Sequence, residues 1–526
     1  MKYLLGKDRN QITIFPVTID QSISEDNEVR IIDLFVDSIP IKDYGFKVDF
    51  IENGRPAYHP ADLLKLYLYG YLNKVRSSRD LEKECSRNIE LMWLLKGLTP
   101  DHNTISNFRR DNPDGIREVF KATVKTAKHF NLIGKKLIAG DSTKLRAQNS
   151  KKNNYNQEKI NRHLEYIDNK LNEYAKILAT EDGDQKKETI KKEIDKHLKR
   201  KEKYHQIEQQ LIETGQDQIS TSDSESRQMI TRNNITEVAY NVQTTVDAAN
   251  NLPIDYKVTN TNDSKAMGEM LGRASEILET TEFTALYDKG YHNGREIKAG
   301  QDMQINLLVA IPDVASNAPD KRYNMANFRY DHKKDTYTCP ENKELTTNGN
   351  WYNKKSGERR AAIQVKHYMT KACETCKARG LCTTNKKGRI IERSEYAENI
   401  EQNRKNIEAH KTLYKQRQAI VEHPYGTIKR QWGFSYILTK EGMQRASSDV
   451  GLMFTAYNLK RIINIIGFEV FKKYLEVLIQ QILQKLASIW TQNLQNKQRK
   501  NYDNFQSGLF DYFLKWLRFD QLLQIN

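Results

Sequence analysis

The chain has 526 residues, of which 11 are Pro, 25 are Gly and 38% are hydrophobic. That length leaves room for about three or four domains and excludes a small disulfide-stapled scaffold, and the composition argues against a low-complexity or disordered chain. The 84 Lys and Arg residues outnumber the 68 Asp and Glu residues, and the net charge of +16 favours a polyanionic partner, nucleic acid before an anionic membrane.

Neither a membrane span nor an export signal is expected. A spanning helix needs about 20 uninterrupted apolar residues, and the candidate stretch at 462–466 is broken by Asn464. The amino terminus, Met1-Lys-Tyr-Leu-Leu-Gly-Lys-Asp, has too short an apolar run for a signal peptide. Five cysteines, four of them between residues 339 and 382, suit a reduced compartment with a local metal site better than a disulfide framework. We therefore expect a cytoplasmic protein with no membrane partner.

Residues 1–130 are predicted to form an all-α domain. Pro60 stands at the first position of a helix, where its missing N–H costs nothing. Further short helices follow, and the last of them begins near Thr99 and carries Asn107, Arg109 and Arg110. Such an arrangement is typical of a helix-turn-helix, in which these side chains would reach DNA phosphates or base edges. A small helical bundle with a polar face is an equally weighted alternative.

Residues 131–312 change character. Lys135 to Asp141 forms a short apolar run, which predicts a strand that delivers the Asp141 carboxylate at its tip. Apolar residues then recur at steps of three and four on both sides of a turn signal at 181–184, which predicts an antiparallel helical hairpin over 155–215. The dense Lys and Glu of this insertion are interpreted as a solvated outer face.

Strand character returns at residue 237. Alternation over 238–246 and 254–258 predicts a β-hairpin, an amphipathic helix follows at 267–278, and a short strand then ends at Asp288. A helix and a strand near 305–311 complete the series. This order predicts a mixed α/β fold with an RNase H-like catalytic core, interrupted by the helical hairpin.

Two aspartates at the ends of neighbouring strands form a hard-oxygen site suited to Mg²⁺ or Mn²⁺, which usually needs a third carboxylate. The candidate is Glu422, within a last catalytic segment at 399–460, and Glu441 is the next candidate. A single acid among 68 is more often a solvated surface group. Only the joint context of Asp141, Asp288 and Glu422 favours a metal site.

A second, cysteine-containing insertion is predicted over 313–398. Cys339, Cys373, Cys376 and Cys382 supply enough thiolates for one tetrahedral Zn²⁺. Inert or reactive thiols are the alternative, because the gap between the first two cysteines is wide. Cys85, in the N-terminal helical region, is interpreted as a core residue.

The tail over 461–526 is predicted to be helical, for packing or self-association, with amphipathic membrane contact as the weaker interpretation. Three histidines flank the motifs and are interpreted as surface or capping residues: His102, His292 and His423.

Four stretches of the chain resemble bacterial insertion-sequence transposases of the DDE type: 59–112, 137–144, 240–291 and 414–429. The last stretch resembles the Tyr-Arg-Glu-Lys signature of that group through Tyr414, Arg417, Glu422 and Lys429. Four residues separate Arg417 from Glu422, where the signature has three. Lys429, seven residues beyond Glu422, could face the same side of a helix and contact a phosphate, although Pro424 predicts a helix start or a kink there.

The resemblance implies a DNA transposase with two Mg²⁺ or Mn²⁺ ions held by Asp141, Asp288 and Glu422. Water would cut at the element's ends, and the released 3′-hydroxyl would attack target DNA at the same site. The implied partners are double-stranded DNA, as terminal inverted repeats and target, and a second copy in a homodimeric synaptic complex in the bacterial nucleoid. Implied DNA contacts are Asn107, Arg109, Arg110, Tyr414, Arg417 and Lys429. A metal-dependent nuclease without strand transfer and a non-catalytic DNA-binding protein are the alternatives.

Overall fold

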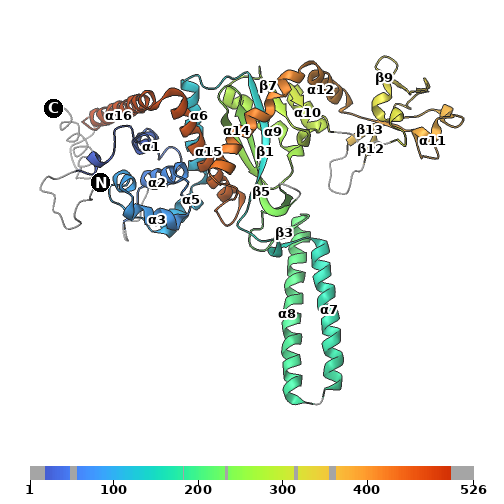
Figure 1. Ribbon diagram of the computed structural model, residues 1–526, viewed down its shortest axis with the longest axis horizontal. Helices are drawn as coiled ribbons and strands as arrows, with labels where there is room; N and C mark the ends of the chain where they lie inside the picture. Colours follow the sequence, from blue (N-terminus) through green and yellow to red (C-terminus); the bar gives the residue numbers. More distant parts are fainter. Residues whose placement is uncertain are drawn as a thin grey trace, which may run out of the picture.

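The structure is a computed structural model that describes residues 18–47, 56–181, 183–231, 235–312, 318–354 and 363–498, with side chains to residue 488. A group of helices from the N-terminal region stands at one side of a central sheet (Figure 1). A long helical hairpin projects away from the sheet, and a small β-rich module lies at the opposite end from the N-terminal helices.

The N-terminal region is all-α. Side chains of Asn27, Ser77 and Asp101 cap three of its helices by accepting backbone N–H groups of the first turn. Pro60 occupies the first helical position, as its sequence context predicts. The helices are α1 (Glu28–Asp37), α2 (Pro60–Leu72), α3 (Ser78–Arg87), α4 (Ile89–Leu94), α5 (His102–Asp111) and α6 (Pro113–His129).

The central sheet is six-stranded and mixed. Strands β6, β5 and β1 lie side by side and antiparallel, and β7 and β8 continue the sheet beyond β1 in parallel. Strand β4 pairs with the start of β5. The strands are β1 (Leu137–Arg146), β4 (Arg227–Ile230), β5 (Thr236–Asp247), β6 (Leu252–Thr259), β7 (Thr284–Tyr287) and β8 (Asn306–Val309).

Strand β1 does not end at Asp141, as the apolar run predicts, but continues for five residues to Arg146. The continuation is stabilised by pairing with β5 up to Arg146. Its polar residues stay in the sheet because backbone hydrogen bonds to β5, rather than hydrophobic side chains alone, hold this part of the strand in place. Asp141 therefore lies within a strand and not at its tip.

Helices cover both faces of the sheet. Residues of alternating parity point to opposite faces, so Ala139, Leu286 and Leu308 pack against Ile420 and Val421 of α14 (Gln416–Tyr425). The other face belongs to the main core. It is covered by α6, α9 (Met267–Leu278), α10 (Gly294–Asp302) and α15 (Met443–Ile466). Helices α12 (Ala397–Ala409) and α13 (Lys411–Tyr414) lead into α14.

The projecting hairpin consists of α7 (Gln157–Thr180) and α8 (Asp184–Thr214). Its antiparallel helices occupy the segment for which the heptad-like spacing predicts them. The short strands β2 (Asn154–Tyr155) and β3 (Ile219–Ser220) pair at its base. The hairpin has a hydrophobic cluster of its own, which consists of Tyr155, Ile160, Ile167, Tyr204, Ile207, Leu211 and Ile219.

The β-rich module holds two three-stranded sheets. Its small cluster of buried side chains comprises Phe328, Tyr337, Leu345, Tyr368 and Ile391. The first sheet contains β9 (Arg329–Asp331), β10 (Thr336–Thr338) and β11 (Glu344–Leu345), and the second contains β12 (Tyr352–Lys354), β13 (Ile363–Tyr368) and β14 (Ile391–Ser394). A one-turn helix, α11 (Arg379–Cys382), carries the last cysteine.

The N-terminal helices and the sheet share one hydrophobic core that runs from Ile23 to Leu475. Asp449 of α15 is fully buried at this junction, where it accepts a hydrogen bond from Tyr71 and pairs with Arg76 at 2.7 Å and Arg109 at 3.5 Å. The predicted boundary at residue 130 thus runs through continuous packing.

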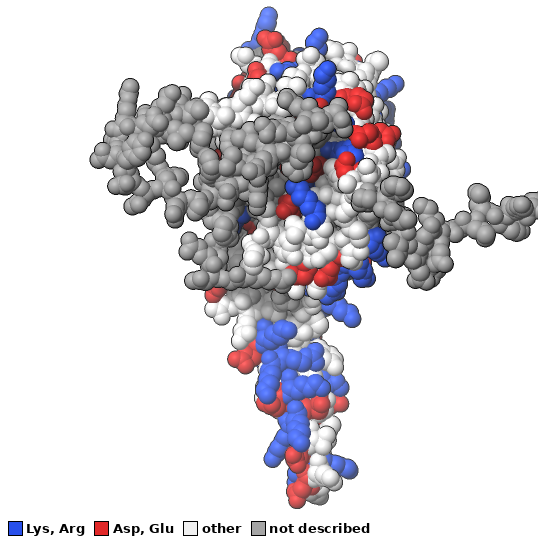
Figure 2. Space-filling model, turned by 90° about the vertical axis from the view of Figure 1, so that its left-hand side faces the viewer, with Lys and Arg blue, Asp and Glu red and all other residues white. Residues whose placement is uncertain are grey.

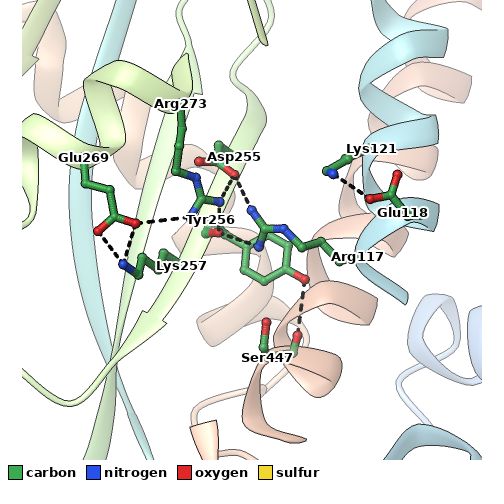
Figure 3. A network of polar contacts seen from close by, with 9 residues as sticks. All are labelled: Arg117, Glu118, Lys121, Asp255, Tyr256, Lys257, Glu269, Arg273 and Ser447. Atoms are coloured by element: carbon green, nitrogen blue, oxygen red, sulfur yellow. Dashed lines mark hydrogen bonds and ion pairs between the residues drawn. The ribbon is translucent and has the colours of Figure 1, made fainter. Parts of the chain in front are cut away.

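A second polar network joins α6 to the sheet (Figure 3). Asp255 of β6 lies 3.0 Å from the Arg117 guanidinium of α6 and 2.6 Å from that of Arg273 on α9. The Tyr256 hydroxyl donates to the Ser447 carbonyl of α15 at 3.3 Å. Buried charges that are paired in this way fix the relative placement of helices and sheet.

Helix α15 crosses the predicted boundary at residue 460 and ends at Ile466, where Gly467 adopts a φ of +87°. Helix α16 (Phe468–Gln498) follows and buries Phe471 and Leu475 in the main core against α1. Within the described part of the chain, no helix is long and apolar enough to cross a membrane.

Candidate active site

The parallel register of β1 and β7 brings Asp141 and Asp288 to the same height along the two neighbouring strands. Leu137 pairs with Thr284 and Ala139 with Leu286, and the same offset of 147 residues leads from Asp141 to Asp288, just past the end of β7. The Asp288 carboxylate is close enough to raise the pKa of Asp141 electrostatically. Strand pairing therefore unites two acids that lie far apart in the sequence.

Gly140 makes the close packing beside Asp141 possible. A Cβ at this position would lie 2.0 Å from Cε1 of the Tyr287 ring, and no other residue type leaves room for that ring. The Tyr287 side chain is buried and lies against Tyr291, with ring centroids 4.8 Å apart. Strand β1 is consequently packed closely against two aromatic rings of the main core, on the face of the sheet opposite to Ala139.

Asp141 lies in a strongly desolvated position. Burial raises the pKa of its carboxyl to about 6, although Arg417 and the Ser142 N–H favour the charged form. The Ser142 N–H donates to Oδ1 at 2.8 Å, and Nη1 of Arg417 lies 3.6 Å from Oδ2. Asp288 and Asp263 raise the pKa further. A cation placed among these carboxylates would relieve their mutual repulsion.

Asp263 is a third carboxylate at the site that the sequence analysis did not select. A Cβ at Gly290 would lie 3.0 Å from Oδ1 of Asp288 and 3.5 Å from Oδ2 of Asp263, which places both carboxylates beside the same residue. Although burial raises the pKa of Asp263, Lys144 and hydrogen bonds from neighbouring side chains hold it below its usual value. The donors are Asn241 at 2.7 Å and Gln243 at 2.8 Å. Its place in the Asn262-Asp263 stretch that resembles the family was the available signal.

Helices α13 and α14 and the turn after them bring basic and phenolic groups to the same strands. The Tyr414 hydroxyl donates to the Tyr287 carbonyl at 3.2 Å, and the Tyr425 hydroxyl donates to the Asp141 carbonyl at 3.3 Å. Nζ of Lys429 donates to Oγ1 of Thr143 at 2.7 Å. The structure therefore gathers Tyr414, Arg417 and Lys429 around β1 and the end of β7.

Glu422 is exposed on α14, where its carboxylate accepts a hydrogen bond from Gln418 at 2.9 Å. Among the described residues, it forms no metal-binding group with Asp141 and Asp288. The five-residue step from Arg417 explains this, because five residues rotate an α-helix by about 140° beyond one full turn. The extra residue in the signature thus turns Glu422 away from the direction of Arg417. Glu441 pairs instead with Arg445 at 3.6 Å.

Pro424 does not start the helix. Helix α14 runs through it to Tyr425 and then widens into a π-helical turn over Gly426–Gln431. Proline removes one backbone hydrogen bond, and the wider turn re-pairs the backbone, with the Trp432 N–H donating to the Thr427 carbonyl at 2.9 Å. The kink allows Lys429 to reach β1 rather than follow the face of Glu422.

The prediction that Arg109 contacts DNA is wrong. Its side chain is 5% exposed, and its guanidinium donates to the Tyr71 hydroxyl at 3.0 Å and pairs with Asp449. Asn107 and Arg110 are exposed on α5, and Arg110 pairs with Asp111 at 2.6 Å. The helical repeat places these two residues on the outer face and turns Arg109 into the core.

The histidines have structural neighbours. Nδ1 of His102 lies 2.9 Å from Oε2 of Glu82, and Nδ1 of His423 lies 2.6 Å from the Tyr457 hydroxyl. Burial lowers the pKa of His292, which keeps its ring neutral. Cys85 is buried in the main core, as predicted.

Among the residues described, no group of three or more His, Cys, Asp or Glu side chains is already drawn together around a common metal position. The donor chemistry at Asp141, Asp263 and Asp288 nevertheless fits a hard cation, because carboxylate oxygens are the ligands that Mg²⁺ and Mn²⁺ prefer. Burial is the main cause of the raised pKa of Asp141, and Asp288 and Asp263 raise it further.

A mixed sheet that gathers carboxylates beside basic side chains is an arrangement of phosphoryl-transfer enzymes with divalent cations. Comparison with protein families makes the assignment specific. Residues 17–111 match a family described as transposase domain (DUF772), and residues 338–463 match a transposase DDE domain. These domains indicate a transposase and confirm the resemblance to DDE-type insertion-sequence transposases. The search of curated proteins produced no match.

The two matches leave residues 112–337 uncovered. The DDE match contains Tyr414, Arg417, Glu422 and Lys429, whereas Asp141, Asp263 and Asp288 lie outside it. The link between these aspartates and the matched segment is therefore spatial. It consists of the contacts of Arg417 and Tyr425 with Asp141.

Proposed function

We propose that the chain cleaves DNA at the ends of an insertion sequence and joins the released 3′-hydroxyl to target DNA. The observation that carries this proposal is the β1–β7 register, which places Asp141 level with Asp288 beside Arg417 of the matched DDE segment. Two acids held in this way by one sheet provide the fixed geometry that phosphoryl transfer requires.

The sheet is proposed to be an RNase H-like core with two insertions. Its order supports this, because an antiparallel β6-β5-β1 meander is extended by parallel β7 and β8. The hairpin of α7 and α8 enters after β1, and the cysteine-bearing module enters after β8. Both insertions leave the pairing of β1 with β7 intact.

Asp141 and Asp288 are the proposed ligands of the catalytic Mg²⁺ or Mn²⁺ ions. When bound, such ions activate the attacking water or 3′-hydroxyl and stabilise the leaving oxygen. Glu422 is the ligand that the family resemblance implies, and it would have to approach from the exposed side of α14. Asp263 is the alternative third carboxylate, because it already lies beside Asp288.

The residues around the acids have separate proposed tasks. Arg417 orients the Asp141 carboxylate and offers its guanidinium to a phosphate that enters the site. Tyr414 supports the end of β7 through the Tyr287 carbonyl, and Lys429 fixes β1 beyond Asp141 through Thr143. Both lie close enough to the strands to contact a DNA backbone that passes over them.

DNA recognition is proposed for two surfaces. Asn107 and Arg110 on the exposed face of α5 would contact the element's ends. The other surface is the hairpin, where Figure 2 shows Lys and Arg side chains gathered along the projecting helices. Lys192, Lys196 and Lys199 of α8 are 74%, 64% and 75% exposed, and the ion pairs they form on the surface are weak competitors for phosphates. A homodimeric synaptic complex in the bacterial nucleoid is the proposed working assembly.

The test uses the purified full chain, a duplex that carries one inverted repeat from the flanks of the gene, and Mg²⁺ or Mn²⁺. We expect cleavage at the repeat and, with a supercoiled target, a joined product. Cleavage without joined product would support a nuclease, and neither product from an enzyme that still binds the repeat would support a DNA-binding protein. A duplex with a scrambled repeat is the matched control.

The third ligand is tested by comparing Glu422→Gln with Asp263→Asn. If Glu422 binds metal, its amide variant loses Mg²⁺-dependent cleavage while repeat binding persists. If Asp263 binds metal instead, Asp263→Asn loses Mg²⁺-dependent cleavage and Glu422→Gln retains it. Glu269→Gln is the matched control, because Glu269 is an exposed acid that pairs with Lys257 on the neighbouring elements.

A further inference from the structure

Four cysteines from separate parts of the β-rich module line one pocket. Cys339 follows β10, Cys373 ends a 3₁₀ turn, Cys376 lies in the next turn, and Cys382 ends α11. All of them are free, half-buried thiols. Cys339, Cys373 and Cys376 each act electrostatically on Cys382, whose pKa is raised mainly by burial.

The wide sequence gap between Cys339 and Cys373 is closed by β pairing. Tyr337 pairs with Leu345 in the first small sheet, so the chain returns beside Cys339. Thr346 then exchanges two backbone hydrogen bonds with Met369, at 2.9 and 3.0 Å. Four residues later the chain reaches Cys373. The sequence distance is therefore no obstacle to a shared site.

The backbone around two of the cysteines has features of a thiolate site. After Cys339 the chain turns tightly, with Asn342 at a φ of +55°, and the Lys343 N–H donates to Sγ of Cys339 at 3.3 Å. The Cys339 sulfur therefore already accepts one backbone hydrogen bond. Gly388 adopts a φ of +86°, and a Cβ there would lie 2.6 Å from Cβ of Cys373. Glycine thus lets the chain close over that cysteine.

The walls of the pocket are basic. Lys343, Arg379 and Arg389 line it together with the thiols, and Arg389 is 8% exposed. Binding of one Zn²⁺ by four thiols would release four protons and leave the centre with a charge of −2. Nearby Lys and Arg side chains compensate such a charge. Glu341 also lines the pocket, so its lining carries three cationic side chains and one acidic side chain.

The module has few other sources of stability. Five buried hydrophobic side chains form its cluster, and Cys339 and Cys382 pack against them. A core of this size rarely maintains a fold without a metal or a disulfide. Two of the four cysteines, Cys339 and Cys382, thus contact the hydrophobic cluster of the module directly.

We propose that Cys339, Cys373, Cys376 and Cys382 bind one structural zinc ion that stabilises this module. The pocket gathers the thiols without yet grouping them at ligand spacing among the described residues, so side-chain rotation on binding must complete the tetrahedron. Such an ion would have a structural role, unlike the ions proposed at Asp141 and Asp288, because four thiolate ligands leave no open position for a substrate.

The experiment measures metal in the purified full-length protein by elemental analysis. We expect about one Zn per chain, its loss in Cys376→Ser, and its retention in Cys85→Ala, which changes a buried cysteine of the main core. Substitution with Co²⁺ should give the visible absorption of a tetrahedral thiolate centre, and chelation should lower the melting temperature. Cleavage activity is not used, so failure of the proposed function leaves this test unaffected.

Two results would overturn the proposal. One is wild-type protein that holds neither Zn²⁺ nor added Co²⁺ and whose melting temperature is unchanged by chelators. The other is full metal content in a variant in which Cys373 and Cys382 are both serine. If Cys376→Ser does not fold, the Co²⁺ spectrum of wild type, recorded with and without prior alkylation of the thiols, still decides the question.

Discussion

Two aspartates of this protein, one fully buried and one half-buried, have opposite surroundings. Asp449 is fully buried at the junction of the N-terminal helices and α15, and although burial itself raises its pKa, Arg76 and Arg109 hold that pKa below its usual value. Asp141 lies beside two further acids with Arg417 at 3.6 Å, and burial raises its pKa to about 6. The first carboxylate is neutralised by the protein. The second retains negative charge that a bound cation would have to balance.

The two carboxylates therefore differ in charge compensation. A raised pKa alone does not mark a functional acid, because burial also raises the pKa of Asp255 to about 7 although Arg117 and Arg273 pair with it. Asp141 differs from Asp255 in lying beside two further acids.

Asp141→Asn should reduce Mg²⁺-dependent cleavage by roughly 10³-fold, because it removes a negative ligand without changing side-chain size. The melting temperature should stay the same or rise, since the variant no longer ionises a poorly compensated buried group. Cleavage assays and thermal unfolding measure the two effects. The comparison fails if the variant unfolds readily, and Asp302→Asn, at an exposed acid paired with Lys298, is the control.

Asp449→Asn should lower the free energy of unfolding by about 3–5 kcal/mol, because Arg76 and Arg109 lose their compensating charge inside the core. Denaturant titration measures this loss. Asp111→Asn, which breaks the exposed pair with Arg110, should cost less than about 1 kcal/mol. Equal losses in both variants would remove the distinction between the two kinds of acid.

The two aspartates should also respond to pH in different ranges. The folded pKa of Asp141, about 6, is above its ordinary value of 3.8, so protons compete with metal once the pH falls below about 6. Apparent Mn²⁺ affinity should then drop by about tenfold per pH unit, while this group itself makes unfolding no easier. Calorimetric titration with Mn²⁺ between pH 5 and 8 tests this.

Asp449 behaves in the reverse manner. Because its folded pKa lies below 3.8, the stability it contributes is complete above that value and is lost only as the pH falls through the folded pKa. Between pH 7 and 5 the protein should therefore lose metal binding before it loses stability. A parallel loss of both would show that the titrating group is not Asp141.

Arg110→Ala should weaken binding to the inverted repeat moderately and reduce the slope of log affinity against log salt by about 1, because one phosphate contact is lost. Arg109→Ala should instead destabilise the fold, since it removes a partner of Asp449. Gel-shift titrations at several salt concentrations, combined with unfolding curves, separate the neighbours. Unchanged salt dependence in Arg110→Ala would locate recognition away from α5.

The local elements and the chemical character of the chain could be predicted from its amino-acid sequence. Periodicity indicated the N-terminal helices, the hairpin of α7 and α8, and the strands that carry Asp141 and Asp288, because side-chain spacing reflects the local backbone repeat. It also singled out the cysteines. Spacing along a helix could even have indicated that Glu422 diverges from Arg417.

Which side chains come into contact depends on how distant segments pack in the folded chain. Arg109 looked like a DNA contact because its buried partner, Asp449, lies 340 residues away in the sequence, and no local pattern reports such a pair. Asp263 joined the acids through the placement of the turn after β6, and Cys339 reached the other cysteines through β pairing. Burial and charge compensation depend on contacts between distant segments, so they arise only when the chain has folded.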